Sequence, residues 1–406
     1  MSPSNRLKTS LAGVALAASA AAAPLSAGDY GKAIVNDKAP VAAWSFCDLW
    51  DHTTLYKGDG FVKSVKFTGR YHGGYIDSSS DLGGVNTSGD VWEHRRWRAG
   101  IVAKLAGNLT FQNIYNLDTT PHFNGHNFVA GLDELFLKWE PSKEFYVIVG
   151  KHKPSILRDF AGSSNRLQVF ERSFITQNTV NQKLWGAAVG FEALGLSHEI
   201  GVWSTHFQDE FQWPTFEDSG ATVVYRTNYG LNENTKLFFD YEYTDQHRRL
   251  GIPANSQLFG APAYEHIFAL GSESKWGDFG IITDAVFAFD RGVTSGGANP
   301  FLPGEDTFGF YITPYYNLTE KLQLVGRYAY ATDGRENRPH RFAAGPLGGN
   351  RPNLEDHHAL YLGIQYFICG DKLKLQLGHE WASASEHVTG ADYDSSTWLA
   401  GVRLSW

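Results

Sequence analysis

Charged residues gather in one stretch of the sequence and recur at alternate positions elsewhere. The segment "VIVGKHKPSILRDFAGSSNRLQVFERS" (147–173) contains Lys151, Lys153, Arg158, Arg166, Glu171 and Arg172. Four more basic residues, Arg70, Arg96, Arg98 and Arg403, stand in segments where polar and apolar residues alternate. Guanidinium and ammonium groups attract and bind anions. The candidate chemistry is therefore electrostatic selection of small polar or anionic solutes at a constriction lined by these residues.

Residue patterns for catalysis or metal binding are missing from the sequence. It has no nucleophile elbow, no phosphate-binding loop and no HExxH motif. The 15 histidines, including His122 and His126 in "HFNGH", have no carboxylate or thiol at ligand spacing. We expect no enzyme activity, no metal and no cofactor.

Alternation of apolar and polar residues predicts that strands must position the charged groups. The composition agrees, since aromatic residues make up 14% of the chain, there are 43 glycines, and the one methionine is the first residue. We expect sixteen strands, near residues 63–77, 92–106, 109–118, 131–139, 145–152, 184–194, 196–206, 220–231, 235–246, 265–275, 278–290, 307–317, 321–332, 357–368, 373–384 and 396–406.

The expected connectors alternate strictly between short and long. Short turns include Gly107-Asn108, Gly195, Gly277 and Gly370-Asp371. Long connectors are expected near 78–91, 119–130, 153–183, 207–219, 247–264, 291–306, 333–356 and 385–395. Outer-membrane barrels have short periplasmic turns and long outer loops. The fold class predicted is therefore all-β: a transmembrane antiparallel β-barrel of 16 strands, inserted in the lipid bilayer.

The period of two also separates a lipid-facing from a lumen-facing side. It places Arg70, Arg96, Arg98, Lys104, Arg226, Arg327 and Arg403 in the lumen, together with Glu134, Asp240, Glu242, Asp284, Asp290 and Glu380. After closure of the sheet, Arg403, Arg70, Arg96 and Arg98 form one basic stripe, opposite acidic residues across the barrel. The last strand, "STWLAGVRLSW", closes the sheet against the first, so that no edge is exposed.

The N-terminus predicts export. Arg6 and Lys8 precede the apolar, small-residue run "LAGVALAASAAAAPLSA", which is typical of a secretory signal peptide covering residues 1–27. Its removal would change the net charge from −8 to −10, because two basic residues leave with it. An acidic protein is a poor partner for nucleic acid. The domain prediction is a signal peptide (1–27), a periplasmic N-terminal segment (28–62) and the barrel (63–406).

One part of the chain resembles a known family. "VIVGKHKPSILRDFAGSSNRLQVFERSFITQNTV", then "KLWGAAVGFEALG", and earlier "RRWRAGIVAKLAGNLTFQNIYNL", resemble the phosphate-selective porin O and P family. The matching motif positions are Gly150, Lys153, Pro154, Phe170, Glu171, Arg172 and Ser173. The resemblance implies an outer-membrane porin of a Gram-negative-type bacterium, a homotrimer, and a third loop folded into the lumen. It also implies a preference for anions such as phosphate.

The third long connector itself indicates the same inward fold. Residues 154–182 mix the apolar residues Leu157, Phe160, Val169, Phe170 and Phe174 with charges, and a loop facing only water needs few such anchors. We expect a water-filled channel for small polar solutes. The alternatives are a substrate-specific sugar porin and an adhesin or structural barrel with a blocked lumen.

The two cysteines suggest a covalent link. Cys369 precedes the short Gly370-Asp371 turn and Cys47 precedes the first strand, so both belong on the periplasmic side. That compartment is oxidising. We expect a Cys47–Cys369 disulfide, with two unpaired thiols as the alternative.

Overall fold

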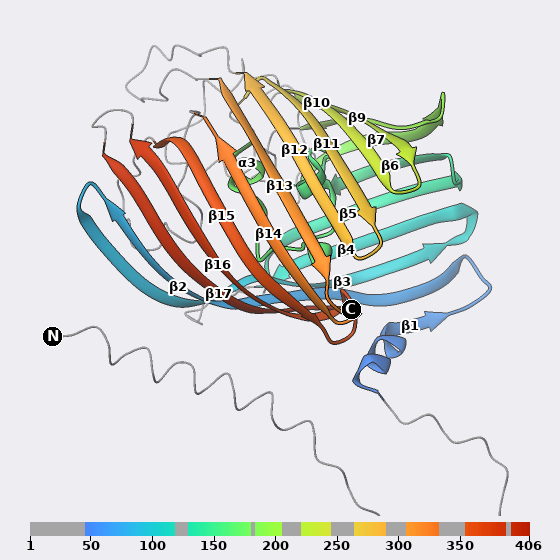
Figure 1. The fold of residues 1–406 in the computed structure, drawn as a ribbon. Coiled ribbons are helices and arrows are strands. Elements are labelled where there is room, and N and C mark those ends of the chain that lie inside the picture. Colours follow the sequence, from blue (N-terminus) through green and yellow to red (C-terminus); the bar gives the residue numbers. More distant parts are fainter. Residues whose placement is uncertain are drawn as a thin grey trace, which may run out of the picture. The chain divides into compact units, whose positions relative to one another are not determined.

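The computed structural model describes residues 45–117, 129–179, 183–204, 221–244, 264–289, 306–332, 354–386 and 391–406. Sixteen long strands, β2–β17, dominate these residues (Figure 1). They are β2 (Val62–Leu82), β3 (Val85–Leu105), β4 (Leu109–Leu117), β5 (Val129–Ser142), β6 (Phe145–His152), β7 (Leu184–Ala193), β8 (Leu196–Ser204), β9 (Ala221–Asn232), β10 (Thr235–Thr244), β11 (His266–Trp276), β12 (Phe279–Phe289), β13 (Thr307–Asn317), β14 (Leu322–Ala331), β15 (Leu354–Phe367), β16 (Leu373–Glu386) and β17 (Asp392–Ser405).

The sheet is a closed antiparallel barrel, as the sequence predicts. Each strand from β2 to β16 pairs with the next strand in the chain, and β17 pairs with β2 to close the ring. At the seam, Gly69 and Trp406 exchange two backbone hydrogen bonds of 3.0 Å. The rings of Phe67 and Trp406 stack there, with centroids 5.8 Å apart. Closure pairs the final strand on both sides, which is why an apolar aromatic strand can end the chain.

The predicted long connector at 78–91 is wrong. Strands β2 and β3 each run for 21 residues and meet at Gly83-Gly84, whose φ angles are 57° and 86°. Two consecutive residues with positive φ make a two-residue hairpin turn that matches the twist of the strands. The polar run "SSSDLGGVNTSGD" (78–90) suggests a loop by composition, but it pairs as an extension of the hairpin. The remaining long connectors, apart from 153–183, lie mostly outside the described residues.

The two faces of the sheet differ as the alternation predicts. On β16 the outward Leu375, Leu377 and Trp381 are 46–49% exposed, whereas the inward Gln376 and Glu380 are 4% and 3% exposed. On β12 the inward Asp284 is likewise buried, while Phe287 and Phe289 point outward. An apolar outer face with a polar interior is the pattern of a barrel in lipid. Among the described residues, no helix is long and apolar enough to cross a bilayer.

A short segment before the barrel is bound to it. The 3₁₀ helix η3 (Phe46–Thr53) leads into β1 (Thr54–Lys57), which pairs with β2. The indole of Trp50 is buried and donates to the backbone oxygen of Ser405. Cys47 and Cys369 form a disulfide with their Cα atoms 5.5 Å apart. The predicted signal peptide and residues 28–44 lie outside the described part of the chain.

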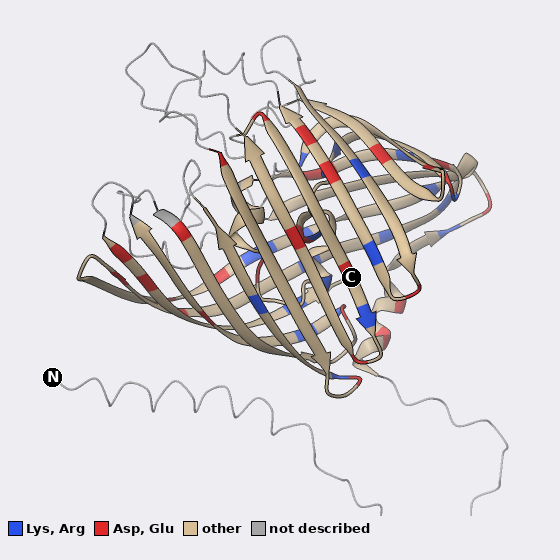
Figure 2. Cartoon of the chain, turned by 45° about the horizontal axis from the view of Figure 1, so that its top comes forward, with Lys and Arg blue, Asp and Glu red and all other residues tan. Residues whose placement is uncertain are grey.

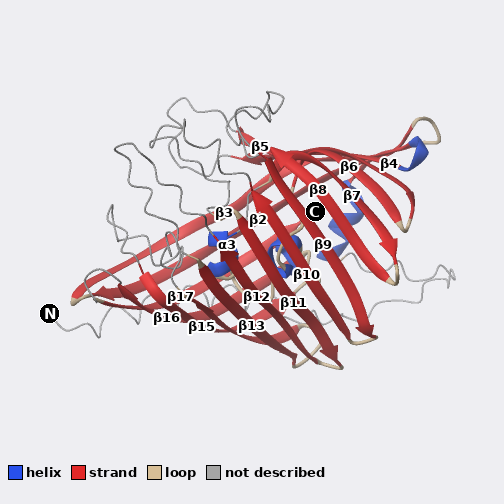
Figure 3. Ribbon diagram, turned by 90° about the horizontal axis from the view of Figure 1, so that it is seen from above, coloured by secondary structure: helices blue, strands red, loops and turns tan. Residues whose placement is uncertain are grey.

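The connector between β6 and β7 carries α2 (Arg158–Ala161), the 3₁₀ turn η5 (Ser164–Arg166) and α3 (Phe174–Thr179). We call residues 153–183 the inner loop. Seen from above, its helices lie inside the ring of strands (Figure 3). Its apolar residues belong to the main hydrophobic cluster, with Ile156, Leu157 and Ile175 fully buried. The core of the protein therefore lies between the inner loop and the inner wall of the barrel.

Candidate functional site

The first part of the inner loop is bound by carboxylates of the wall. The backbone N–H of Leu157 donates to Asp240 on β10 at 2.7 Å, and that of Asp159 donates to Asp284 on β12 at 3.3 Å. The guanidinium of Arg158 pairs with Glu273 on β11 at 2.6 Å. The first N–H groups of a helix have no partner within it, so these carboxylates satisfy the start of α2.

The second part of the inner loop crosses to the opposite wall, where basic side chains donate hydrogen bonds to its carbonyl oxygens. Arg403 on β17 donates to the backbone oxygens of Ser164, Val169 and Phe170, the second at 3.2 Å. Lys374 on β16 donates to Leu167 O at 3.0 Å, and Arg70 on β2 donates to Ser164 Oγ at 2.8 Å. Backbone groups removed from water need such partners. The acidic wall therefore holds loop N–H groups and the basic wall holds loop carbonyls.

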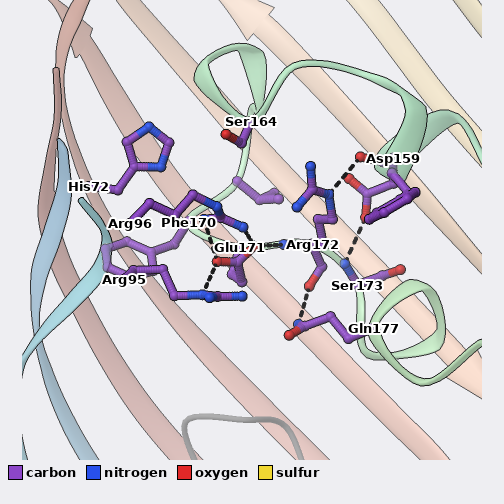
Figure 4. A network of polar contacts seen from close by, with 12 residues as sticks. His72, Arg95, Arg96, Asp159, Ser164, Phe170, Glu171, Arg172, Ser173 and Gln177 are labelled. Atoms are coloured by element: carbon purple, nitrogen blue, oxygen red, sulfur yellow. Dashed lines mark hydrogen bonds and ion pairs between the residues drawn. The ribbon is translucent and has the colours of Figure 1, made fainter. Parts of the chain in front are cut away.

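Glu171 is the central ion-pairing group of the inner loop. It accepts from Arg95 at 2.6 Å and makes two 2.8 Å bonds with Arg96 (Figure 4). Arg327 on β14 donates to the backbone oxygen of Glu171 at 2.6 Å. Burial by itself would raise the pKa of Glu171, but Arg95 and Arg96 outweigh it and hold the pKa well below its usual range. The carboxylate is therefore charged and fixed.

A β-bulge explains how two consecutive arginines reach the same carboxylate. Neighbours along a strand normally point to opposite faces. In the β2–β3 pairing, His72 lies opposite Arg96 while Gly73 lies opposite His94, so Arg95 is an extra residue. A bulge of this kind turns an additional side chain toward the same face. The sequence pattern predicted Arg96 to be inward and missed Arg95.

A second bulge builds an ion cluster on β5. Ile114 lies opposite Glu134 and Tyr115 opposite Leu132, which leaves Asp133 as the extra residue. Lys183, at the end of the inner loop, pairs with both Asp133 and Glu134, the latter at 2.7 Å. Arg98 contacts Asp133 at 3.1 Å. Neither Asp133 nor Lys183 was predicted. Regular alternation puts Asp133 on the lipid side, and Lys183 lies just after the stretch 154–182 whose apolar and charged residues indicated the inward fold.

The remaining predicted basic residues have different roles. Lys153 donates to the carbonyls of Phe160, Ala161 and Gly162 at 2.7–2.9 Å and so caps α2. Burial, then the neighbouring Arg172 and Lys183, hold the pKa of Lys153 well below its usual value. Lys151 on β6 is 3% exposed, and its Nζ donates to the backbone oxygen of Leu132 on β5 at 2.8 Å.

Two arginines of the inner loop differ sharply in burial. Arg172 donates to Asp159 O at 3.0 Å, and burial, followed by repulsion from Arg96, lowers its pKa to about 10. Arg166 keeps 79% of its side chain exposed, and its nearest carboxylate, Asp371, is 4.0 Å away. Arg166 is therefore available to a passing solute, whereas Arg172 is part of the packing.

Arg70, Arg96, Arg98 and Arg403 lie on three neighbouring strands, as predicted. Arg70 pairs with Arg98 across β2 and β3, and His72 lies between Arg403 and Arg96 in the register. Basic and acidic residues appear on the strands as separate blue and red bands (Figure 2). The stripe contacts the inner loop directly through Arg70, Arg96 and Arg403, which the sequence did not show. Asp290 lies outside the described residues, and Lys104 is exposed and bonded to Thr110 at 2.8 Å.

A small cavity lies between the inner loop and the β12–β14 side of the wall. It has a volume of about 30 Å³ and lies between loop residues such as Arg158 and Arg166 and wall residues such as Tyr311, Thr313 and Arg327. This volume accommodates about two water molecules. The cations Arg70, Arg95, Arg98 and Lys183 lie on the other side, along β2–β5, where their side chains keep partial exposure.

Residues 65–219 match the family model for phosphate-selective porin O and P, which confirms the resemblance found in the sequence. Solved structures share the fold. OmpT, described as outer-membrane expressed, of Vibrio cholerae has 13% identity and a TM-score of 0.52, over 86% of this chain and 99% of its own. The outer membrane channel DcaP of Acinetobacter baumannii has 9% identity and a TM-score of 0.55, over 86% and 99%.

OprB of Pseudomonas putida, solved at high pH, has 10% identity and a TM-score of 0.55, over 84% of this chain and 94% of its own. No curated protein sequence matches the chain. The family match and the closed barrel support an outer-membrane porin channel.

Proposed function

We propose that this outer-membrane porin passes small polar solutes by diffusion and prefers anions, phosphate among them. The observation that carries the proposal is the unequal exposure of the two charges in the ion pairs that Arg95 and Arg98 make beside the inner loop. Arg95 is 20% exposed against 1% for its partner Glu171, and Arg98 is 19% exposed against 5% for Asp133. The two carboxylates are almost completely buried, while the side chains of Arg95 and Arg98 keep about a fifth of their surface exposed.

Exposed guanidinium groups can bind an anion without giving up their structural partners. Arg166 adds the most exposed cation of the inner loop. A lumen lined in this way raises the local concentration of anions and lowers that of cations. The net negative charge of the chain does not oppose this, because acidic residues such as Asp77, Asp81, Asp90 and Asp394 lie on β2, β3 and β17 away from the inner loop in the register.

Zero-current potentials of single channels in a potassium chloride gradient test the proposal. We expect the zero-current potential of the wild type to have the sign that corresponds to chloride preference. In Arg166→Glu this preference should be smaller. The matched control is Lys143→Glu, which reverses a charge in the exposed turn after β5, outside the inner loop. A cation preference of the wild-type channel would contradict the proposal.

Liposome swelling distinguishes the alternative functions. Free entry of neutral sugars that is only limited by size fits a diffusive pore, and saturable entry of one sugar fits a specific sugar porin. No swelling at all fits an adhesin or structural barrel with a blocked lumen. The matched family and the structural neighbours that are channels support a transport function rather than an enzymatic one.

We also propose a homotrimer, which the family resemblance supports. Light scattering of the purified protein in detergent, corrected for bound detergent, measures the mass of the assembly. A mass of about three chains is expected, and a monomer would contradict the assignment.

A further inference from the structure

A groove of about 510 Å³ lies outside the lumen, on strands β14–β17 beside the tip of the β2–β3 hairpin. Its wall includes Trp381, Leu360 and Tyr328, which are 46%, 42% and 38% exposed. The residues that alternate with them, Ala382, Ala359 and Ala329, are at most 5% exposed. The groove therefore faces the lipid side of the barrel.

The register arranges the groove in two rows. One row holds Asp81, Asp394 and Ser383, which lie opposite one another on β2, β17 and β16. The next row holds Ser396, Trp381 and Leu360. The groove lies near the end of β16 at Glu386 and the start of β17 at Asp392, which is the end of these strands opposite the short turn at Gly370. Short turns are periplasmic in such barrels, so the groove lies toward the outer leaflet.

The lining chemistry selects the ligand class. Serine hydroxyls and the carboxylates of Asp81 and Asp394 give both donors and acceptors beside an exposed indole. None of the described residues that line the groove is a lysine or an arginine, so the groove offers more to the hydroxyl groups of a headgroup than to its phosphates. Neutral sugar rings have hydroxyl groups at their edges and an apolar face. They therefore fit a pocket that is mostly apolar and carries a few polar groups.

The indole of Trp381 is held in place before any ligand arrives. Its ring packs on the ring of His379 with centroids 4.2 Å apart, and Trp398 on the neighbouring strand also packs on that histidine, at 4.3 Å. Ser396 Oγ lies 3.1 Å from Nε2 of His379. Asp81 is also fixed, because its Oδ1 accepts from the backbone N–H of Gly84 at 2.9 Å. A site with fixed side chains loses less conformational entropy on binding.

We propose that this groove binds the glycosyl headgroup of an outer-leaflet glycolipid. The sugar ring lies against the Trp381 indole, and its hydroxyls exchange hydrogen bonds with Ser383, Ser396 and Asp394. Because the groove lies on the lipid-facing wall, its occupant is a glycolipid of the membrane. The same position separates this site from any solute site in the lumen.

Native mass spectrometry of the purified full-length assembly tests the proposal. The probes are rough-type lipopolysaccharide, the saccharide released from it, and phosphatidylglycerol. We expect retention of the lipopolysaccharide in preference to phosphatidylglycerol, and at least a tenfold weaker retention in Trp381→Leu and Asp394→Asn. Trp276→Leu is the matched control, since this tryptophan is 49% exposed at the short-turn end of β11. It should retain lipopolysaccharide like the wild type.

Two variants are used so that the test still gives an answer if one of them fails to fold. Folding of each variant is checked by comparing the gel migration of heated and unheated samples. The proposal would be overturned if the wild type and both variants retained lipopolysaccharide equally. It would also be overturned if the wild type retained phosphatidylglycerol as well as lipopolysaccharide. Loss of the oligomer in Trp381→Leu with unchanged lipopolysaccharide binding would also overturn it, and would assign the groove to contact between copies of this chain. Binding of the free saccharide in competition with lipopolysaccharide would support recognition through the sugar.

Discussion

At the scale of single residues, the charges of the lumen hold the inner loop as well as facing water. Alternation alone correctly grouped Arg70, Arg96, Arg98 and Arg403 on neighbouring strands. It did not show that Arg403 donates to three loop carbonyls or that Arg96 binds Glu171. Partners that are far apart in sequence depend on the path of the loop, which a strand pattern does not contain.

Replacing Glu171 by glutamine should release the inner loop. The change removes this counter-charge from the buried Arg96 and the partly exposed Arg95, and breaking a buried pair such as Arg96–Glu171 costs about 3–5 kcal/mol. We expect larger and noisier single-channel currents. Glu140→Gln is the control, because Glu140 is 41% exposed and its pair with Lys138 is worth less than about 1 kcal/mol. Wild-type current in Glu171→Gln would contradict the role assigned to this carboxylate.

The lowered pKa of Glu171 predicts that the inner loop stays in place at mildly acidic pH. Because the folded pKa of Glu171 is depressed, its stabilising contribution is complete above its ordinary pKa of 4.5 and is lost only as the pH falls through the lower folded value. Single-channel current levels should therefore stay constant from neutral pH down to pH 4.5. A change in current centred near pH 4.5 in the wild type, and missing in Glu171→Gln, would show that the pKa of Glu171 is not lowered.

At the scale of elements, the number of strands and the ends of several of them follow from sequence, while the bulges do not. The expected strands 145–152 and 307–317 coincide with β6 and β13. The long β2–β3 hairpin was missed because serine and aspartate dominate its tip, and composition favoured a loop. The extra residues Arg95 and Asp133 were missed because a bulge depends on the pairing partner rather than on the strand's own residues.

The backbone at Gly150 gives a physical reason for the glycine at this position of the family motif. It has a φ of 129°, and a Cβ at this position would meet Leu135 O and lie 2.8 Å from Phe136 Cα on β5. Gly150→Ala should strain the backbone by about 1–3 kcal/mol just before the inner loop begins. Urea unfolding followed on unheated gels should show a lower midpoint.

Gly89→Ala is the control for this change, because a Cβ there meets nothing within 4 Å and φ is not positive. Its midpoint should match the wild type within error. Equal midpoints for all three proteins would mean that β5 and β6 tolerate a side chain at residue 150.

At the scale of the whole molecule, a ring of sixteen strands is tied at its seam by backbone pairing and near its first residues by a disulfide. The sequence predicted the closed ring from the strict alternation of connectors and the apolar last strand. It could place Cys47 and Cys369 on one side of the membrane but not within bonding distance, since that depends on how η3 packs against the end of β17.

Removing the disulfide should destabilise the barrel. Cys47 and Cys369 are separated by 322 residues, and a native disulfide that closes a long loop typically contributes about 2–4 kcal/mol. Cys47→Ser/Cys369→Ser should therefore unfold at a lower urea concentration than the wild type. An identical midpoint in the wild type before and after reduction would contradict this contribution.

The central claim is that the inner loop lies inside the lumen and lines the solute path, and a thiol placed on it tests this directly. Ser163 is exposed on the inner loop, and both native cysteines are paired, so Ser163→Cys introduces one reactive thiol. Leu194→Cys, at a residue 96% exposed in the short turn after β7, is the matched control. We predict that a bulky anionic methanethiosulfonate lowers the single-channel current of Ser163→Cys in one step and leaves that of Leu194→Cys unchanged. Complete modification of Ser163→Cys without any fall in current would contradict the account.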